Sequence, residues 1–134
     1  SDLPWENYPD RKTSCLIGRW SSKVSSQYTH YPRPQDSGNH EDVTEVTLTN
    51  KEGKGIRVTA IDRPFSFSAL YYTVDDIYKA THDCDLKPRK EIILSLDAAV
   101  LGLGNSSCGP GVLKKYAIDK QKPHTLRVRF SLIK

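Results

Sequence analysis

Apolar and polar residues alternate with a period of two over much of the chain, and this period predicts β-strands. Residues 42–49 and residues 56–60 both alternate, and the stretch between them, residues 50–55, is rich in turn-forming residues. The pattern therefore predicts a hairpin. The apolar residues that share one face of this hairpin are Val46 and Leu48 on the first strand and Ile56, Val58 and Ala60 on the second.

Four later stretches also have the pattern of strands. Residues 65–71 alternate large apolar with small polar side chains, as a half-buried strand does, and residues 91–97 alternate as well. Residues 100–104 predict a short partner strand, and residues 126–132 show the most regular two-residue period in the chain.

One short helix is expected after the strand at residues 65–71. The hydroxyl of Thr73 can cap its start, and Asp76 lies three residues on, as in a capping box. Asp75 and Asp76 also suit the positive end of a helix, which explains these adjacent carboxylates better than an acid/base pair does. We expect the helix over residues 74–81, and about six strands with one helix predict an antiparallel all-β fold.

The start of the chain differs from the rest, because aromatic residues and prolines replace the alternating pattern. Residues 32–39 combine two prolines with turn formers, which excludes a helix there. A chain of 134 residues suits one hydrophobic core. We therefore predict a single domain over residues 1–134, with an irregular segment at 1–41 and antiparallel strands over 42–134.

Charge and hydropathy limit the classes of partner. The net charge is +4, from 20 Lys and Arg against 16 Asp and Glu, and the basic residues form no dense stripe of the kind that binds nucleic acid. Mean hydropathy is −0.58, and no run approaches the roughly 18 apolar residues that a membrane helix needs. We therefore expect neither nucleic acid nor a membrane as a partner.

Residue spacing alone identifies no catalytic residue, metal site or cofactor. Cys15, Cys84 and Cys108 lack the C-x-x-C spacing of metal and redox sites, so no disulfide framework is predicted, while a single bridge between two of them stays open. The four histidines are far apart in the sequence and are expected to be exposed or capping residues: His30, His40, His82 and His124.

A glycine-rich loop is the strongest candidate for binding. Residues 102–111 contain four glycines and one proline, directly after a predicted strand. Such a loop can bring backbone amides and short hydroxyls close to a ligand, which is one way in which proteins bind sugars. A plain crossover between strands explains the same glycines, and the pattern alone slightly favours that interpretation.

Four motifs together resemble a known family. They are Glu-Asn-Tyr-Pro-Asp-Arg at residues 6–11, Tyr-Pro-Arg-Pro-Gln-Asp-Ser-Gly at 31–38, Pro-Phe-Ser-Phe-Ser-Ala-Leu-Tyr at 64–71 and Asp-Ala-Ala-Val-Leu-Gly-Leu-Gly at 97–104. In order and spacing they resemble the C-terminal domain of bacterial β-galactosidases of glycoside hydrolase family 2. The resemblance implies an antiparallel β-sandwich of the supersandwich, galactose mutarotase-like type, of which this chain is the later half. We therefore expect a C-terminal fragment of a longer enzyme, and the absence of methionine agrees.

The resemblance also implies where the chemistry lies. In that family two glutamates on a separate (β/α)₈ barrel hydrolyse terminal β-D-galactosides with retention, and no glutamate here matches them. The family's loop after the fourth motif presents an aromatic residue to the aglycone side of the active site. The corresponding residues here are Asn105, Ser106, Ser107 and Cys108, with Cys108 at the aromatic position. Because a thiol cannot stack on a sugar ring, this subsite is weaker, built by another residue or tuned to a different aglycone.

These observations predict a non-catalytic sandwich module that needs no cofactor. Its implied partners are the catalytic barrel of the parent enzyme, in a bacterial cytoplasm or periplasm, and the galactoside, which it meets only through the parent active site. The alternative is a stand-alone carbohydrate-binding or protein-interaction sandwich, whose contact surface is the aromatic segment from Trp5 to Tyr31. Because half a sandwich leaves edges unpaired, we expect the isolated fragment to hide them by forming a homodimer or by strand exchange, with residues 126–132 as the candidate contact.

Overall fold

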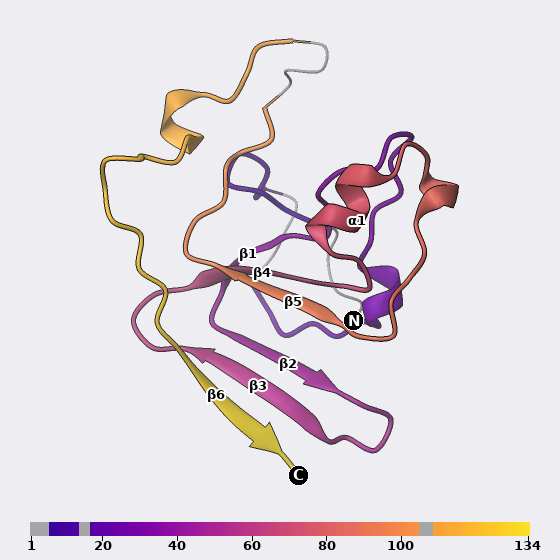
Figure 1. Cartoon of the computed structure of the whole chain (residues 1–134). Coiled ribbons are helices and arrows are strands. Elements are labelled where there is room, and N and C mark those ends of the chain that lie inside the picture. The colour runs from indigo at the N-terminus through magenta and orange to yellow at the C-terminus, as the bar shows by residue number, and fades with distance from the viewer. Residues whose placement is uncertain (1–5, 14–16, 105–108) are drawn as a thin grey trace.

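Two three-stranded antiparallel sheets form the body of the computed structural model, which describes residues 6–13, 17–104 and 109–134. The strands of the first sheet are, in spatial order, β1 (His40–Val43), β4 (Phe65–Leu70) and β5 (Ile93–Asp97). The strands of the second sheet are β2 (Glu45–Thr49), β3 (Gly55–Ala60) and β6 (Val128–Ile133). Figure 1 shows the second sheet at the end of the molecule that carries the C-terminus. The predicted antiparallel all-β sandwich is confirmed.

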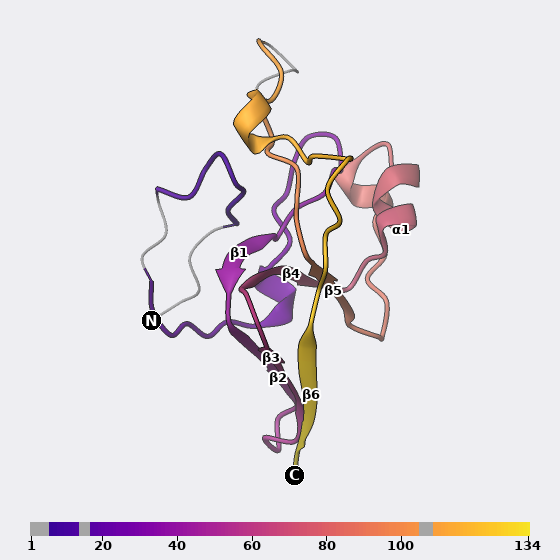
Figure 2. The ribbon, with the colours of Figure 1, turned by 90° about the vertical axis from the view of Figure 1, so that its left-hand side faces the viewer.

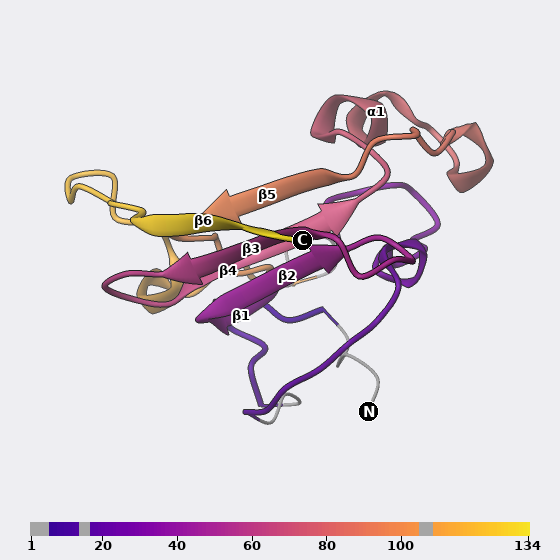
Figure 3. The ribbon, with the colours of Figure 1, turned by 90° about the horizontal axis from the view of Figure 1, so that it is seen from below.

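The hydrophobic core lies between the two sheets. Val46 and Val58 contribute to it from the second sheet, and Phe65, Phe67 and Ala69 contribute from the first. Val58 is fully buried and Phe65 is 2% exposed. Strands of the two sheets run in similar directions (Figure 3), as in aligned sandwich packing.

The predicted hairpin is formed by β2 and β3. Val46 lies opposite Val58, and Leu48 lies opposite Ile56, so the apolar face is the one that the alternation predicts. A Cβ atom at Gly55 would lie only 1.8 Å from the carbonyl oxygen of Leu48, so this close approach of the two strands requires glycine.

The single strand predicted over residues 42–49 is instead two strands in different sheets. Asp42 has a φ of 58°, which breaks the extended backbone, and the chain passes at Thr44 from β1 to β2. The alternation could not reveal this change of sheet, because it continues across the break and Asp is one of the residues that tolerate a positive φ.

Strand β4 is buried on both faces, whereas the sequence predicts a half-buried strand. Phe65 and Phe67 face the core between the sheets, while Ser66, on the opposite face, is also only 4% exposed. The Ser66 hydroxyl donates to the Glu41 carboxylate at 2.7 Å. The Ser66 side chain is thus covered by Glu41 rather than by solvent.

The single α-helix that the structure describes, α1 (Val74–Lys79), starts as predicted and ends before the predicted Thr81. Thr73 and Asp76 form the expected capping box, with bonds of 3.1 and 2.9 Å. Arg89 donates two hydrogen bonds to the Asp76 carboxylate, at 2.5 and 2.8 Å, and these bonds hold the pKa of that carboxyl well below its usual range. Asp76 is therefore a capping residue rather than a catalytic acid.

Three short 3₁₀ turns complete the described elements: η1 (Val24–Ser26), η2 (Asp83–Asp85) and η3 (Lys114–Tyr116). A second apolar cluster joins Tyr28 to Leu70 of β4 and Ile77 of α1. Among the residues placed by the structure, no helix is long and apolar enough to cross a membrane. The same residues contain no group of three or more His, Cys, Asp or Glu that could hold a metal ion.

Candidate functional site

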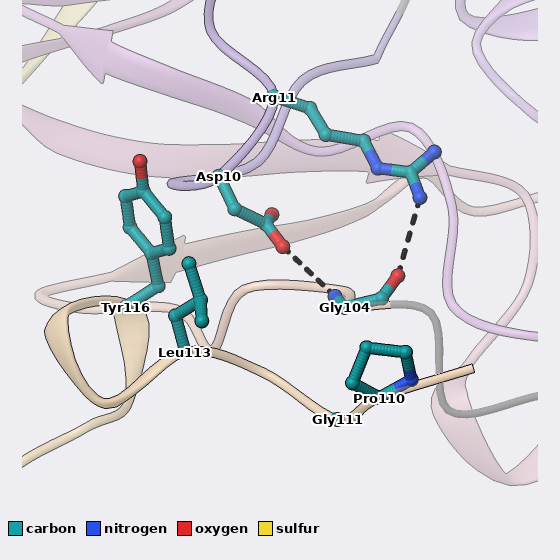
Figure 4. Close-up of a pocket in the computed structure, with 7 residues that line it drawn as sticks. All are labelled: Asp10, Arg11, Gly104, Pro110, Gly111, Leu113 and Tyr116. Atoms are coloured by element: carbon teal, nitrogen blue, oxygen red, sulfur yellow. Dashed lines mark hydrogen bonds between the residues drawn. The ribbon is translucent and has the colours of Figure 1, made fainter.

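The segments on both sides of the predicted loop residues border an open cavity of about 400 Å³. The loop residues themselves, Asn105, Ser106, Ser107 and Cys108, lie outside the described part of the chain. The flanking segments project from the sheets at the end opposite the C-terminus (Figures 1 and 2). The cavity is lined by Asp10, Arg11, Gly104, Pro110, Gly111, Leu113 and Tyr116 (Figure 4).

Asp10 anchors the start of this loop. Its Oδ1 accepts a hydrogen bond from the N–H of Leu103 at 3.1 Å, and its Oδ2 accepts one from the N–H of Gly104 at 2.8 Å. Hydrogen bonds to a carboxylate are stronger than those between neutral groups. One side chain near the N-terminus therefore holds two successive peptide groups that are more than 90 positions away.

Arg11 binds Gly104 from the carbonyl side. Its Nη2 donates to the carbonyl oxygen of Gly104 at 3.2 Å, so Gly104 is bound through both its N–H and its C=O (Figure 4). Gly104 has a φ of 62°, and a Cβ atom there would lie 2.8 Å from the backbone nitrogen of Val112. The outgoing and returning segments of the loop are thus in contact, and this contact requires glycine.

A second link joins the two segments further from the loop tip. The N–H of Gly102 donates to the carbonyl of Tyr116 at 3.2 Å. A Cβ atom at Gly102 would lie 2.9 Å from Asp10 Cγ and 3.0 Å from Tyr116 Cβ. The strand predicted over residues 100–104 is wrong, because the amides of residues 102–104 bind Tyr116 and Asp10 instead of a neighbouring strand.

The segment that carries Asp10 is itself fixed against β1. Asn7 donates its N–H to the carbonyl of Asn39 at 2.8 Å, and its Oδ1 accepts from the N–H of Glu41 at 2.7 Å. Asn7 is 7% exposed and Tyr8 is 4% exposed. The first motif of the chain therefore connects β1 to the glycine-rich loop.

A protein-family model described as "Beta galactosidase small chain" matches residues 3–132. The chain belongs to this family. The first motif and the glycine-rich loop, which the structure brings together, both lie within the matched range.

The curated relatives of this chain are proteins named β-galactosidase, and they are much longer than the chain. The chain is similar to a "Beta-galactosidase" from Kluyveromyces lactis, with 34% identity over 119 residues, and to one from Arthrobacter sp. (strain B7), with 32% identity over 131 residues. It is also similar to "Beta-galactosidase BgaC" of Bifidobacterium adolescentis, with 34% identity over 132 residues. These matches cover 88%, 94% and 96% of this chain. The chain spans only 11%, 13% and 12% of the respective relatives.

Asp10 is a fixed negative charge in this member of the family. Burial of the carboxyl acts to raise its pKa, but the hydrogen bonds from Gly104 and Leu103 oppose burial and hold the pKa below the ordinary value. The group is therefore ionised at neutral pH and accepts hydrogen bonds only. Its chemistry suits an anchor and does not suit a proton donor.

None of the described aromatic residues in the aromatic segment is exposed, and Trp20 and Tyr31 are half-buried. Tyr8 and Tyr28 are buried, and the hydroxyls of Tyr8 and Tyr31 both donate to the Glu6 carboxylate. Burial, followed by the bond to Glu6 and its charge, raises the pKa of Tyr31 to about 12, so this phenol stays neutral. Trp5 lies outside the described residues. This packing weighs against the alternative in which aromatic residues from Trp5 to Tyr31 form a contact surface.

Three of the four histidines lie on the surface, as the sequence predicts, but His40 does not. His30, His82 and His124 are exposed, and His30 Nδ1 lies 2.6 Å from Asp83 Oδ2. His40 is 7% exposed and packs its ring against Phe67. Its Nε2 lies 2.7 Å from Gln27 Oε1. Burial lowers the pKa of His40 to about 4. The prediction was wrong there because the residue belongs to β1 and not to a turn.

Of the cysteines, Cys84 is an exposed free thiol, while Cys15 and Cys108 lie outside the described residues. Sequence reasoning missed Asp10, Arg11 and Tyr116 as neighbours of the loop. One signal was available, since Asp10 and Arg11 end the first motif of the family resemblance. No spacing rule connects that motif to a loop more than 90 residues later.

Proposed function

We propose that this chain is a non-catalytic module of a bacterial β-galactosidase of glycoside hydrolase family 2, which hydrolyses terminal β-D-galactosides. In this proposal the module packs on the catalytic barrel of the parent enzyme. Its loop at Asn105, Ser106, Ser107 and Cys108 borders the aglycone side of the parent active site. The two catalytic glutamates belong to the barrel, so this chain supplies shape and binding rather than chemistry.

The observation that carries the proposal is the anchoring of the glycine-rich loop. A plain crossover needs glycines for tight turns, but it needs no side chains from a distant segment to hold its start. Here Asp10 and Arg11 bind Gly104 from both sides, and Gly102 binds Tyr116. Such anchoring of one loop supports a role in binding, because binding residues are commonly placed on loops held by a rigid scaffold.

An uncovered apolar face supports packing against the rest of a larger enzyme. Because Val58 lies opposite Phe130 and Ile56 lies opposite Leu132, the apolar side of β3 continues onto β6. There Phe130 is 61% exposed and Leu132 is 79% exposed. Large apolar side chains that line one face of an edge strand indicate a surface covered by another element.

The experiment that tests the proposal is the substitution Cys108→Trp in the full-length enzyme that contains this chain. An indole beside the acceptor should stack on a sugar ring, so acceptor binding should strengthen several-fold, an effect on the order of 1 kcal/mol. Binding of galactose, measured as product inhibition, should stay the same. If Cys108→Trp lowers the melting temperature and leaves acceptor binding unchanged, the side chain belongs to a packed interior and the proposal fails.

A further inference from the structure

A second cavity, of about 350 Å³, lies between the second motif, residues 31–38, and helix α1. Sites for small molecules have volumes of roughly 300 to 1,000 Å³, so this cavity is large enough for a small ligand. Three residues of the motif and three of the helix line it: Arg33, Pro34, Asp36, Val74, Ile77 and Tyr78.

The helix side of the cavity is aromatic and apolar. Tyr78 is 86% exposed and Val74 is 66% exposed, and the two residues lie one turn apart on the same face of α1. Ile77, which also lines the cavity, is buried. Exposed apolar side chains beside a cavity form the kind of surface that contacts a ligand, and an aromatic ring suits the apolar C–H face of a sugar.

The motif side of the cavity is polar. Arg33 and Asp36 both line it, and within the described part of the chain neither side chain forms an ion pair or a hydrogen bond. The Arg33 guanidinium offers donors, and the Asp36 carboxylate offers acceptors. Because the two charges cancel, the lining selects neither an anion nor a cation. It suits a neutral ligand that both donates and accepts hydrogen bonds, as the hydroxyls of a sugar do.

Both walls of the cavity are held in place by contacts within the chain. Prolines precede and follow Arg33 and restrict the backbone there, and the carbonyl oxygen of Asp36 accepts from the Tyr8 hydroxyl at 3.3 Å. On the other wall, the capping box fixes the start of α1. A site whose walls are already ordered loses less conformational freedom when a ligand binds.

We propose that this cavity binds a neutral saccharide. The ring of Tyr78 lies against the C–H face of one sugar, and Arg33 and Asp36 hydrogen-bond to its hydroxyls. The inference goes beyond the proposed function, because it gives this chain a sugar site built from its own residues and does not require the loop at residues 105–108 to border a pocket. The names of the relatives suggest lactose, which carries a β-galactosyl group, as the probe.

Contact with another part of a longer enzyme is the competing explanation for the exposed ring of Tyr78. An apolar protein surface that covered Tyr78 would also remove Arg33 and Asp36 from water, and charged groups without partners are costly to bury. A saccharide instead brings hydroxyls that hydrogen-bond to both groups. The lining of the cavity therefore favours a sugar over an apolar protein surface.

The test is a titration of the ¹⁵N-labelled 134-residue chain with lactose, followed by NMR through the backbone amide shifts. We expect saturable shifts at residues 33–36 and 74–78. Tyr78→Ala should raise the dissociation constant about fivefold, because the stacking surface is lost, whereas Tyr78→Phe keeps the ring and should change it by less than about twofold. Asp36→Ala removes acceptors for the sugar hydroxyls and should raise it at least about threefold.

Leu113→Ala is the matched control, because Leu113 is an exposed apolar side chain that lines the other cavity. It should leave the dissociation constant for lactose unchanged. Urea midpoints check that each variant is folded. If Tyr78→Ala shortens the helix, Asp36→Ala decides the matter, since the Asp36 side chain makes no contact that the fold needs.

Saturable shifts at the cavity that weaken in Tyr78→Ala and Asp36→Ala support the proposal. An absence of saturable shifts with lactose would overturn it, and so would an equal loss of affinity in Leu113→Ala, which would place the sugar at the other cavity. Displacement of lactose by inorganic phosphate would show that the lining selects an anion. If lactose does not bind the chain while Cys108→Trp strengthens acceptor binding in the full-length enzyme, this inference is wrong and the proposed function stands.

Discussion

The backbone N–H of Gly38 donates a 2.6 Å hydrogen bond to the carboxylate of Glu6, which lies 32 positions earlier in the chain. The same carboxylate accepts from the hydroxyls of Tyr31 and Tyr8. Glu6 therefore ties the first and second motifs of the family into one hydrogen-bonded unit. Because the first motif also carries Asp10, the stability of this unit bears on the position of the glycine-rich loop.

Glu6→Gln should destabilise the chain. The Gln amide keeps one acceptor oxygen but loses the charge, so a hydrogen bond from Gly38 or Tyr31 is weakened or lost, at a cost of about 1 to 3 kcal/mol. The free energy of unfolding in urea measures the change. Glu52→Gln is the matched control, since the exposed Glu52 side chain pairs with Lys54 in the β2–β3 turn, and it should have little effect. Equal free energies of unfolding for the two variants would show that the Glu6 hydrogen bonds do not stabilise the chain.

Gly38→Ala should cost more stability than Gly53→Ala. Both glycines have a positive φ, of 73° and 81°, so both substitutions carry a similar backbone strain. A Cβ atom at Gly38 would lie 2.6 Å from the carbonyl oxygen of Gln27, whereas a Cβ atom at Gly53 meets nothing within 4 Å. The difference between the urea midpoints of the two variants measures the steric contribution to the loss of stability. A smaller loss of stability for Gly38→Ala than for Gly53→Ala would contradict the described packing.

His40 should make stability depend on pH below neutrality. Burial lowers its folded-state pKa from 6.5 to about 4. As the pH falls through this window, the unfolded chain takes up a proton that the folded chain does not, so the free energy of unfolding decreases. The decrease attributable to His40 between pH 7 and pH 5 is about 2 kcal/mol, and below the folded-state pKa it becomes constant.

The variant His40→Gln isolates this contribution, because it removes the titrating group and leaves the other groups in place. Urea unfolding at the two pH values should show a smaller pH dependence for His40→Gln than for the unchanged chain. His124→Gln replaces an exposed histidine and should retain the full dependence. An identical slope in all three proteins would rule out a buried, neutral His40.

The exposed edge strand β6 should cause the isolated chain to associate. Phe130 and Leu132 are exposed on the apolar side of the sheet, and within the described part of the chain β6 pairs with β3 alone. Leu132→Lys should shift the chain towards monomer in light scattering, because a charge on this face opposes burial. Ser131→Lys, on the opposite face of the same strand, should shift it less. A monomer at high concentration in the unchanged chain would refute association through β6.

The regular parts of this fold follow from the sequence because each depends on a local pattern. The hairpin of β2 and β3 follows from alternation and a turn, and the start of α1 follows from Thr73 and Asp76. The same local rules do not detect the change of sheet at Asp42, because a positive φ at one Asp leaves the alternation unchanged.

The candidate site was less predictable, since long-range contacts create it. The glycines of residues 102–111 indicated a loop, but the bonds from Asp10 to Leu103 and Gly104 join residues more than 90 positions apart. Those bonds also explain why residues 100–104, which the sequence predicts as a strand, do not form one. Buried His40 shows the same limit, because its burial depends on Phe67 and Gln27 rather than on its neighbours in sequence.

The most direct test of the central claim, that this chain supplies shape and not chemistry, is a hydrolysis assay with the chain alone. The isolated 134-residue chain is incubated with o-nitrophenyl β-D-galactoside beside the full-length β-galactosidase that we propose contains it. We predict release of o-nitrophenol at the rate of the buffer control for the chain alone and rapid release for the enzyme. Release by the isolated chain above the buffer control, abolished by replacing one of its own carboxylates as in Glu41→Gln, would contradict the account.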